Sequence, residues 1–183
     1  MPRTLWLLRH AKTVTDPPDG GTDFDRVLAP RGRRDATALG HCLAPKGTLH
    51  GLGRATRPTV AMVSPAARTA ATAELVLAHW TIPPVVRMVP DLYGAEPNDV
   101  LDLLRALDDD ISSVMVVGHN PTAHALSVGL IDRTDKKGHA LAAKRGFPTS
   151  ALGIYTFDTD SWREVVSHSA TLKGLWIPPF GQE

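Results

Sequence analysis

Three short apolar runs, each followed at once by polar residues, constrain the fold more than any other feature of the sequence. They cover residues 5–8, 60–63 and 114–117. An apolar run of this length, bounded by turn and helix-start residues, is typical of a strand that is buried on both faces. Such strands belong to parallel sheets that are covered by helices. The runs therefore predict an α/β fold.

Helix-start signals follow two of the runs. Ser64 and Asn120 are placed as N-caps, and Pro65 and Pro121 would then occupy the first helical position. Serine and asparagine favour the N-cap, and proline favours the next position because the missing N–H is not needed there. We therefore expect each of these two strands to lead directly into a helix.

Apolar spacing predicts the remaining elements. Helices are expected over 31–43, 66–79, 121–130 and from Pro97 onward, and strands over 4–8, 85–89, 151–157 and 162–168, with a tight turn at 158–161. Residues 132–146 are expected to form a flexible loop, and residues 169–183 a C-terminal tail. Alternating strands and helices predict one domain over 1–183, a three-layer α/β/α sandwich whose mostly parallel sheet has an antiparallel edge.

Cationic and imidazole side chains stand at the carboxyl ends of the three apolar runs. Arg9 and His10 follow the first run, Arg68 the second and His119 the third. Carboxyl ends of parallel strands meet at one edge of a sheet, so we expect these four side chains to converge. Two guanidiniums, two imidazoles and two helix N-termini suit a compact dianion such as phosphate.

Several motifs also resemble one protein family. They are Arg-His-Ala-Lys at 9–12, Ser-Pro-Ala-Ala-Arg-Thr-Ala at 64–70 and Val-Gly-His-Asn-Pro at 117–121, with further matches at 28–36, 92–95 and 147–151. The chain resembles the histidine phosphatase superfamily, also called phosphoglycerate mutase-like, over nearly its whole length. Within it the chain is most similar to the SixA-type phosphohistidine phosphatases, because Ala11 follows the Arg-His pair where mutase-like members commonly have glycine.

The resemblance implies a role for each of the four residues. His10 would be the nucleophile that accepts the phosphoryl group, and Arg9, Arg68 and His119 would clamp it. A neutral imidazole is nucleophilic near neutral pH, and phosphoryl transfer otherwise needs mainly positioning and positive charge. Water would then hydrolyse phospho-His10, with no metal and no cofactor.

The general acid is the least defined part of this interpretation. Glu96 is the nearest candidate, but it lies at a predicted helix start, where an acidic residue is favourable for the helix dipole alone. A site without an acid suits phosphohistidine, whose leaving group needs little protonation. We therefore expect a protein phosphohistidine phosphatase. The alternatives are a phosphatase of small phosphoesters and a low-turnover phosphate-binding or regulatory protein.

Composition argues against several other partners. The formal net charge is +1, and no segment is rich enough in Lys and Arg to follow a nucleic-acid backbone. No apolar stretch reaches the roughly 18 residues of a membrane span. The N-terminus leads straight into a strand, so we expect no signal peptide and a cytoplasmic location. Cys42 is the single cysteine and is expected to pack in the core rather than form a disulfide.

Overall fold

One mixed sheet lies at the centre of the computed structural model, which describes residues 1–44 and 57–180. Within these residues the sheet has six strands in the order β3-β2-β4-β1-β5-β6. Strands β1 to β4 run parallel, and β5 pairs antiparallel with both β1 and β6. The predicted antiparallel edge is thus confirmed. The strand bounds are β1 (Arg3–Arg9), β2 (Val60–Val63), β3 (Val85–Met88), β4 (Ser113–Gly118), β5 (Leu152–Phe157) and β6 (Ala170–Trp176).

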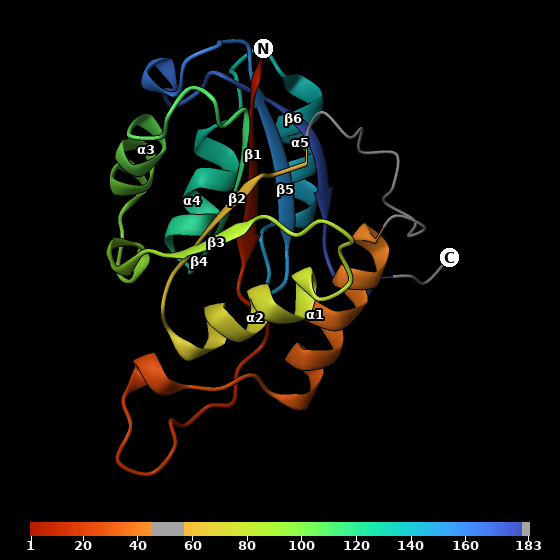
Figure 1. The fold of residues 1–183 in the computed structure, drawn as a ribbon. Helices are drawn as coiled ribbons and strands as arrows, with labels where there is room; N and C mark the ends of the chain where they lie inside the picture. The colour runs from red at the N-terminus through yellow and green to blue at the C-terminus, as the bar shows by residue number, and fades with distance from the viewer. Residues whose placement is uncertain (45–56, 181–183) are drawn as a thin grey trace.

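Helices cover both faces of this sheet (Figure 1). One buried cluster joins α1 and α2 to the sheet, and the other joins α3, α4 and α5 to the opposite face. The predicted three-layer α/β/α arrangement is therefore confirmed. The helices are α1 (Pro30–Leu43), α2 (Ala67–Leu77), α3 (Pro97–Arg105), α4 (Thr122–Gly129) and α5 (Lys136–Arg145), with short 3-10 turns η1 (Asp23–Asp25), η3 (Pro90–Leu92) and η4 (Trp162–Glu164).

Strand β1 shows why its apolar run is continuous. Successive side chains of a strand point to opposite faces, so Leu5 and Leu7 pack under α3 and α4, whereas Trp6 and Leu8 pack under α1 and α2. All four side chains are at most 1% exposed. Full burial of such a side chain stabilises the fold by roughly 1.5–3 kcal/mol. The strand that ends at Arg9 is therefore tightly packed, and it fixes the position of the residues that follow it.

The segment 132–146 is a correction to the sequence analysis, which predicted a flexible loop. Residues 136–145 form helix α5, and the carboxylate of Asp135 caps it by accepting a hydrogen bond from the Gly138 N–H at 2.9 Å. Gly138 and Ala142 are buried on its inner side. The many lysine and arginine residues made the apolar spacing of this helix hard to recognise in the sequence, although those side chains occupy only its outer face.

The C-terminal region is a second correction. The prediction of a strand over 162–168 is wrong, since 162–164 form the 3-10 turn η4, where Trp162 is buried. The partner of β5 is instead β6, which lies within the predicted 169–183 tail. Residues 181–183 of that tail lie outside the described residues.

Two helix starts also differ from the prediction. Helix α2 begins at Ala67 with Ala66 as its N-cap, and α4 begins at Thr122 after Pro121. Ser64 and Asn120 therefore do not act as N-caps. The predicted helix beginning at Pro97 is confirmed, and Cys42 is buried on α1 as expected.

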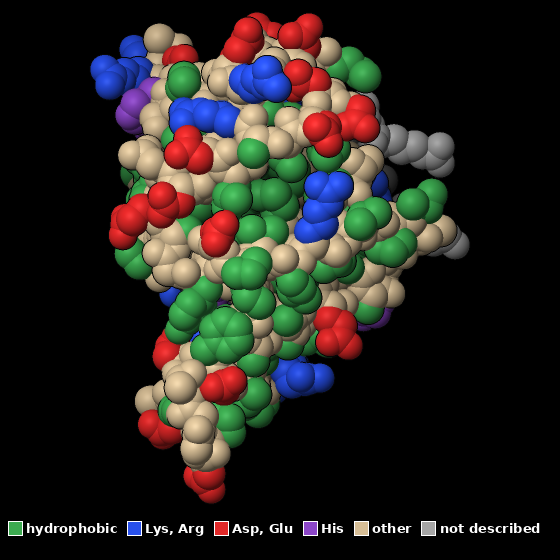
Figure 2. All heavy atoms as spheres, turned by 60° about the vertical axis from the view of Figure 1, so that its left-hand side comes forward, with side chains coloured by type: hydrophobic (Ala, Val, Ile, Leu, Met, Phe, Trp, Pro, Cys, Tyr) green, Lys and Arg blue, Asp and Glu red, His purple; other side chains and the backbone are tan. Residues whose placement is uncertain are grey.

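The sheet edge formed by β3 differs from the interior strands. Val85, Val86 and Met88 are exposed there, whereas every residue of β2 and β4 is buried. Figure 2 brings the side of α3 to the front and shows hydrophobic side chains gathered across the middle of that face. Among the described residues, no helix is long and apolar enough to cross a bilayer.

Candidate active site

The four predicted site residues come together at the carboxyl ends of β1, β2 and β4. Backbone hydrogen bonds continue the sheet past its last strand residues, from the His10 N–H to Gly118 O at 3.1 Å and from the Ser64 N–H to Val117 O at 3.1 Å. The rings of His10 and His119 lie 5.3 Å apart between centroids. The convergence expected from parallel strand ends is therefore present in the structure.

The ring of His10 is held in a single tautomer. Its Nδ1 lies 2.8 Å from the carbonyl oxygen of Ala11, and because a carbonyl only accepts, Nδ1 carries the proton. Burial lowers the pKa of His10 to about 4, with the charges of Arg68 and Arg9 acting in the same direction against the hydrogen bond to Ala11. The Nε2 of His10 therefore has a free lone pair at neutral pH.

His119 is held between two side chains from the β2–α2 segment. Its Nδ1 accepts a hydrogen bond from Arg68 Nε at 3.2 Å, and its Nε2 lies 2.7 Å from Ser64 Oγ. An arginine only donates, so Nε2 carries the proton of the neutral ring and donates it to Ser64. Burial, followed by the charge of Arg68, lowers the pKa of His119 to about 3. His119 is thus a neutral imidazole.

Arg9 places a second guanidinium beside His10. Its Nη1 donates to the carbonyl oxygen of Phe147 at 3.0 Å. Its Nε is buried and has no hydrogen-bond partner among the described residues. Burial lowers the pKa of the guanidinium, although an arginine remains protonated near neutral pH. A buried positive charge is costly unless an anion lies near it, so Arg9 favours an anion at this end of the sheet.

Thr72 ties the segment after β1 to the start of α2. Its hydroxyl accepts a hydrogen bond from the Ala11 N–H at 3.0 Å and donates to the carbonyl oxygen of Arg68 at 2.6 Å. The threonine is fully buried. One side chain therefore fixes the spacing between the turn that carries His10 and the helix that carries Arg68.

Three side chains that were not predicted for the site contact this centre. Asp23 lies in η1, on the loop that follows β1, and Arg68 Nη2 donates to its Oδ2 at 2.9 Å. Tyr93 donates from its hydroxyl to the same oxygen at 3.2 Å, and Ser64 holds His119. Desolvation raises the pKa of Asp23, but the hydrogen bond from Arg26 and the charge of Arg68 outweigh it, so the pKa lies below its usual value.

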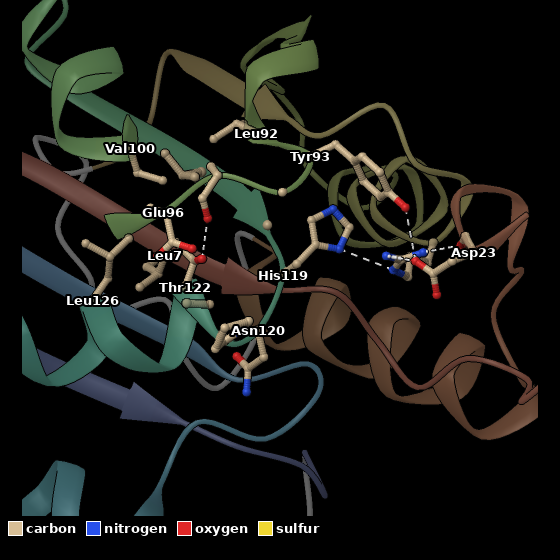
Figure 3. Close-up of a pocket in the computed structure, with 17 residues that line it drawn as sticks. Leu7, Asp23, Leu92, Tyr93, Glu96, Val100, His119, Asn120, Thr122 and Leu126 are labelled. Atoms are coloured by element: carbon tan, nitrogen blue, oxygen red, sulfur yellow. Dashed lines mark hydrogen bonds and ion pairs between the residues drawn. The ribbon is translucent and has the colours of Figure 1, made fainter. Parts of the chain in front are cut away.

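A cavity of about 290 Å³ opens beside Arg68 and His119. Figure 3 shows His119 between Asp23 on one side and the apolar side chains of Leu7 and Leu126 on the other. Glu96 also lines this cavity, but it is the N-cap of α3, and its backbone N–H donates to Asp99 Oδ2 at 2.8 Å. The predicted helix-start position of Glu96 is confirmed.

Comparison with known proteins places the chain in a family. Residues 5–89 match the profile of the histidine phosphatase superfamily (branch 1). An uncharacterized protein of Mycobacterium tuberculosis is 36% identical over 176 residues, which is 93% of this chain and 99% of that protein. A candidate SixA phosphohistidine phosphatase of Nakamurella multipartitia is 29% identical with a TM-score of 0.78, covering 98% of both chains. The chain belongs to the histidine phosphatase superfamily, in its SixA-type branch.

A second solved histidine phosphatase supports the same placement. The candidate SixA phosphohistidine phosphatase of Agrobacterium tumefaciens is 30% identical with a TM-score of 0.75, covering 97% of this chain and 99% of that one. The likeness extends over the whole sheet and both helical layers rather than one motif. The chain is accordingly a phosphatase with the phosphoglycerate mutase-like fold.

Proposed function

We propose that this histidine phosphatase removes the phosphoryl group from phosphohistidine on a protein, with His10 as the nucleophile and with Arg9 and Arg68 as the clamp. His119 completes the clamp when its Nε2–H passes from Ser64 Oγ to a phosphoryl oxygen. The observation that carries the proposal is the orientation of His10. Its Nδ1–H is fixed on Ala11 O, so the unprotonated Nε2 is the nitrogen left for attack. The lowered pKa, about 4, keeps that nitrogen unprotonated at neutral pH.

In the first step, the lone pair of His10 Nε2 forms a bond to phosphorus while the phosphorus–nitrogen bond of the substrate breaks. The departing imidazole keeps the electron pair and takes up a proton from solvent. In the second step, water attacks phospho-His10, inorganic phosphate leaves, and the Nε2 lone pair is restored. Arg68 and Arg9 supply positive charge to the phosphoryl oxygens in both steps, which is the main requirement of phosphoryl transfer.

The carboxyl groups near the clamp support a nitrogen leaving group. Glu96 is exposed at the start of α3, where it is the N-cap of the helix. Asp23 is paired with Arg68 and Arg26, and its lowered pKa keeps it ionised. The ionised Asp23 cannot donate the proton that an alkoxide leaving group requires. An imidazole leaving group needs less protonation, which favours phosphohistidine over alkyl phosphates.

The solved relatives support this substrate as well. Both structures at 29–30% identity are named as candidate SixA phosphohistidine phosphatases. The cavity beside His119, about 290 Å³, has room for an imidazole ring, and the ring of Tyr93 forms part of its wall. A phosphohistidine-bearing protein is therefore the proposed partner.

A phosphatase of small phosphoesters is the second candidate, and the position of Glu96 in the cavity wall favours it. A comparison of substrates separates the two. The purified protein is assayed against a phosphohistidine peptide and a panel of alkyl and aryl phosphates, with His10→Ala as the inactive control. We expect kcat/KM for the peptide to exceed that for alkyl phosphates by about a hundredfold, which corresponds to roughly 3 kcal/mol of transition-state stabilisation. Equal values, or a preference for an alkyl phosphate, would favour the small-phosphoester reading.

A further inference from the structure

Both pairs of parallel N–H groups on Arg68 are engaged by the protein itself. Nη1 donates to the backbone oxygen of Asp23 at 2.6 Å and Nη2 donates to its Oδ2 at 2.9 Å, so Asp23 occupies one pair. The other pair includes the Nε–H, which donates to Nδ1 of His119 at 3.2 Å. One of the two N–H groups of that pair is therefore occupied. A guanidinium holds a phosphoryl group in two parallel hydrogen bonds only through such a pair. Bidentate binding therefore requires Asp23 or His119 to leave.

Asp23 is the acceptor that can leave at lower cost. The Asp23 side chain is 54% exposed, whereas that of Arg68 is 8% exposed. His119 follows β4 directly and is fixed on its other side by Ser64. Asp23 instead lies in the three-residue turn η1 on the loop after β1, which Figure 1 shows extending away from the body of the molecule. A movement of this loop exposes the Nη1–H and Nη2–H groups of Arg68 that Asp23 occupies, and it does not disturb the sheet.

Arg26 provides a second cationic partner for the displaced carboxylate. Arg26 Nη1 donates to the other oxygen of Asp23, Oδ1, at 2.9 Å. The Arg26 side chain is itself anchored, since its Nε donates to Val14 O at 3.2 Å and its Nη2 donates to the hydroxyl of Thr13. Asp23 can therefore release Arg68 while its charge stays paired with Arg26.

We propose that Asp23 is a specificity-determining residue whose carboxylate occupies Arg68 in the free enzyme and is displaced by the dianionic phosphoryl group of the substrate. The proposal rests on the proposed function, because it takes Arg68 as part of the phosphate clamp. A dianion interacts with the guanidinium more strongly than the single charge of Asp23 does. A singly charged ligand carries the same charge as the carboxylate that it would replace, so Arg68 gains no attraction from the exchange. The contact thereby makes the clamp selective for doubly charged ligands.

The proposal predicts two effects of opposite sign for Asp23→Asn. The free protein loses the anion that pairs with the buried Arg68 charge, so its unfolding midpoint should fall. Oxyanion binding should become tighter, because the ligand no longer competes with a carboxylate for Nη2 of Arg68, whereas the bond from Nη1 to the backbone oxygen is the same in both proteins. If Asp23 only orients Arg68, both stability and oxyanion affinity should fall together.

Isothermal titration calorimetry of the full chain with tungstate, a dianion, tests the expected tightening of oxyanion binding directly. We expect the Kd of Asp23→Asn to be about tenfold below that of the wild type, which is the size expected for loss of one charged, half-exposed competitor. The matched control is Asp25→Asn. Asp25 lies in the same turn and carries the same charge, but its Oδ2 accepts from the Thr22 N–H and hydroxyl. Its Kd should equal that of the wild type.

Unchanged or weaker tungstate binding by Asp23→Asn would overturn the proposal. Equal tightening in Asp23→Asn and Asp25→Asn would also overturn it, by showing an effect of net charge alone. Should Asp23→Asn not fold, Tyr93→Phe removes the hydrogen bond from the Tyr93 hydroxyl to Asp23 Oδ2 and should tighten binding about twofold; no tightening would contradict the proposal. Tungstate binding needs no turnover, so a wild type that fails to hydrolyse phosphohistidine refutes the proposed function and leaves this test intact.

Discussion

Acidification from pH 7 to pH 5 should destabilise the protein through His10 and His119. The fold lowers the pKa of His10 to about 4 and that of His119 to about 3, in both cases mainly by burial. An unfolded histidine titrates near 6.5. Between these values the unfolded chain binds more protons than the folded one, so the free energy of unfolding falls as the pH falls. The stabilising contribution of the neutral rings is complete only above about pH 6.5.

The magnitude follows from the two pKa values. At pH 5 an unfolded histidine is almost fully protonated while the folded one is almost fully neutral, which costs about 2 kcal/mol per ring relative to pH 7. Both rings are only partly buried, and solvent reduces the effect, so we expect about 1 kcal/mol for each. Together they should contribute roughly 2 kcal/mol to the loss of stability between pH 7 and pH 5.

Urea unfolding at pH 7, 6 and 5 and constant ionic strength measures this contribution. The double variant His10→Gln/His119→Gln cannot take up these protons, so it should lose roughly 2 kcal/mol less than the wild type over that range. Carboxylates whose pKa values are lowered, such as Asp109, titrate in both proteins and cancel in the comparison. The exposed His124, changed to Gln, serves as the control for replacing a histidine outside the site. Equal losses in the wild type and the double variant would refute the claim that the fold holds both rings neutral.

Substitutions at three positions test the remaining parts of the site, each with circular dichroism to verify the fold. Arg68→Ala should lower kcat by about a hundredfold, and Arg68→Lys should recover little because an ammonium cannot form two parallel bonds; near-normal turnover in either would contradict the clamp. Ser64→Ala should lower kcat by about tenfold and shift the Nε2 resonance of His119, since it removes the acceptor that fixes this ring; an unchanged resonance would argue against that contact. Glu96→Gln should change the rate on phosphohistidine by less than about twofold, and a collapse of that rate would make Glu96 the acid.

The parts of the fold that periodicity specifies were predictable. Residues 5–8, 60–63 and 114–117 read as strands because both faces of each strand are covered, so every position is apolar. The antiparallel edge was predicted correctly for β5 but not for its partner. Lysine and glycine interrupt the apolar pattern of β6, and one side of this edge strand is partly exposed.

The site was only partly predictable because some contacts depend on a loop. Arg9, His10, Arg68 and His119 were accessible to sequence reasoning, since strand ends fix where they lie. The contact between Asp23 and Arg68 joins residues 45 positions apart, and the turn-rich segment before Asp23 indicates a loop without indicating where it folds back. Ser64 was predicted to be an N-cap because a hydroxyl before a helix is typical of that position, whereas in the structure it holds His119.

Trapping the enzyme intermediate tests the central claim most directly. The wild type is mixed rapidly with a phosphohistidine peptide, quenched, and examined for protein-bound phosphate by mass spectrometry and phosphorus NMR. We expect a phosphate that is labile in acid and stable in base, attached to Nε2 of His10, the nitrogen left free by the bond from Nδ1 to Ala11. It should be absent from His10→Ala, which should also lose turnover. Phosphate on another residue, or full turnover in His10→Ala, would contradict the account.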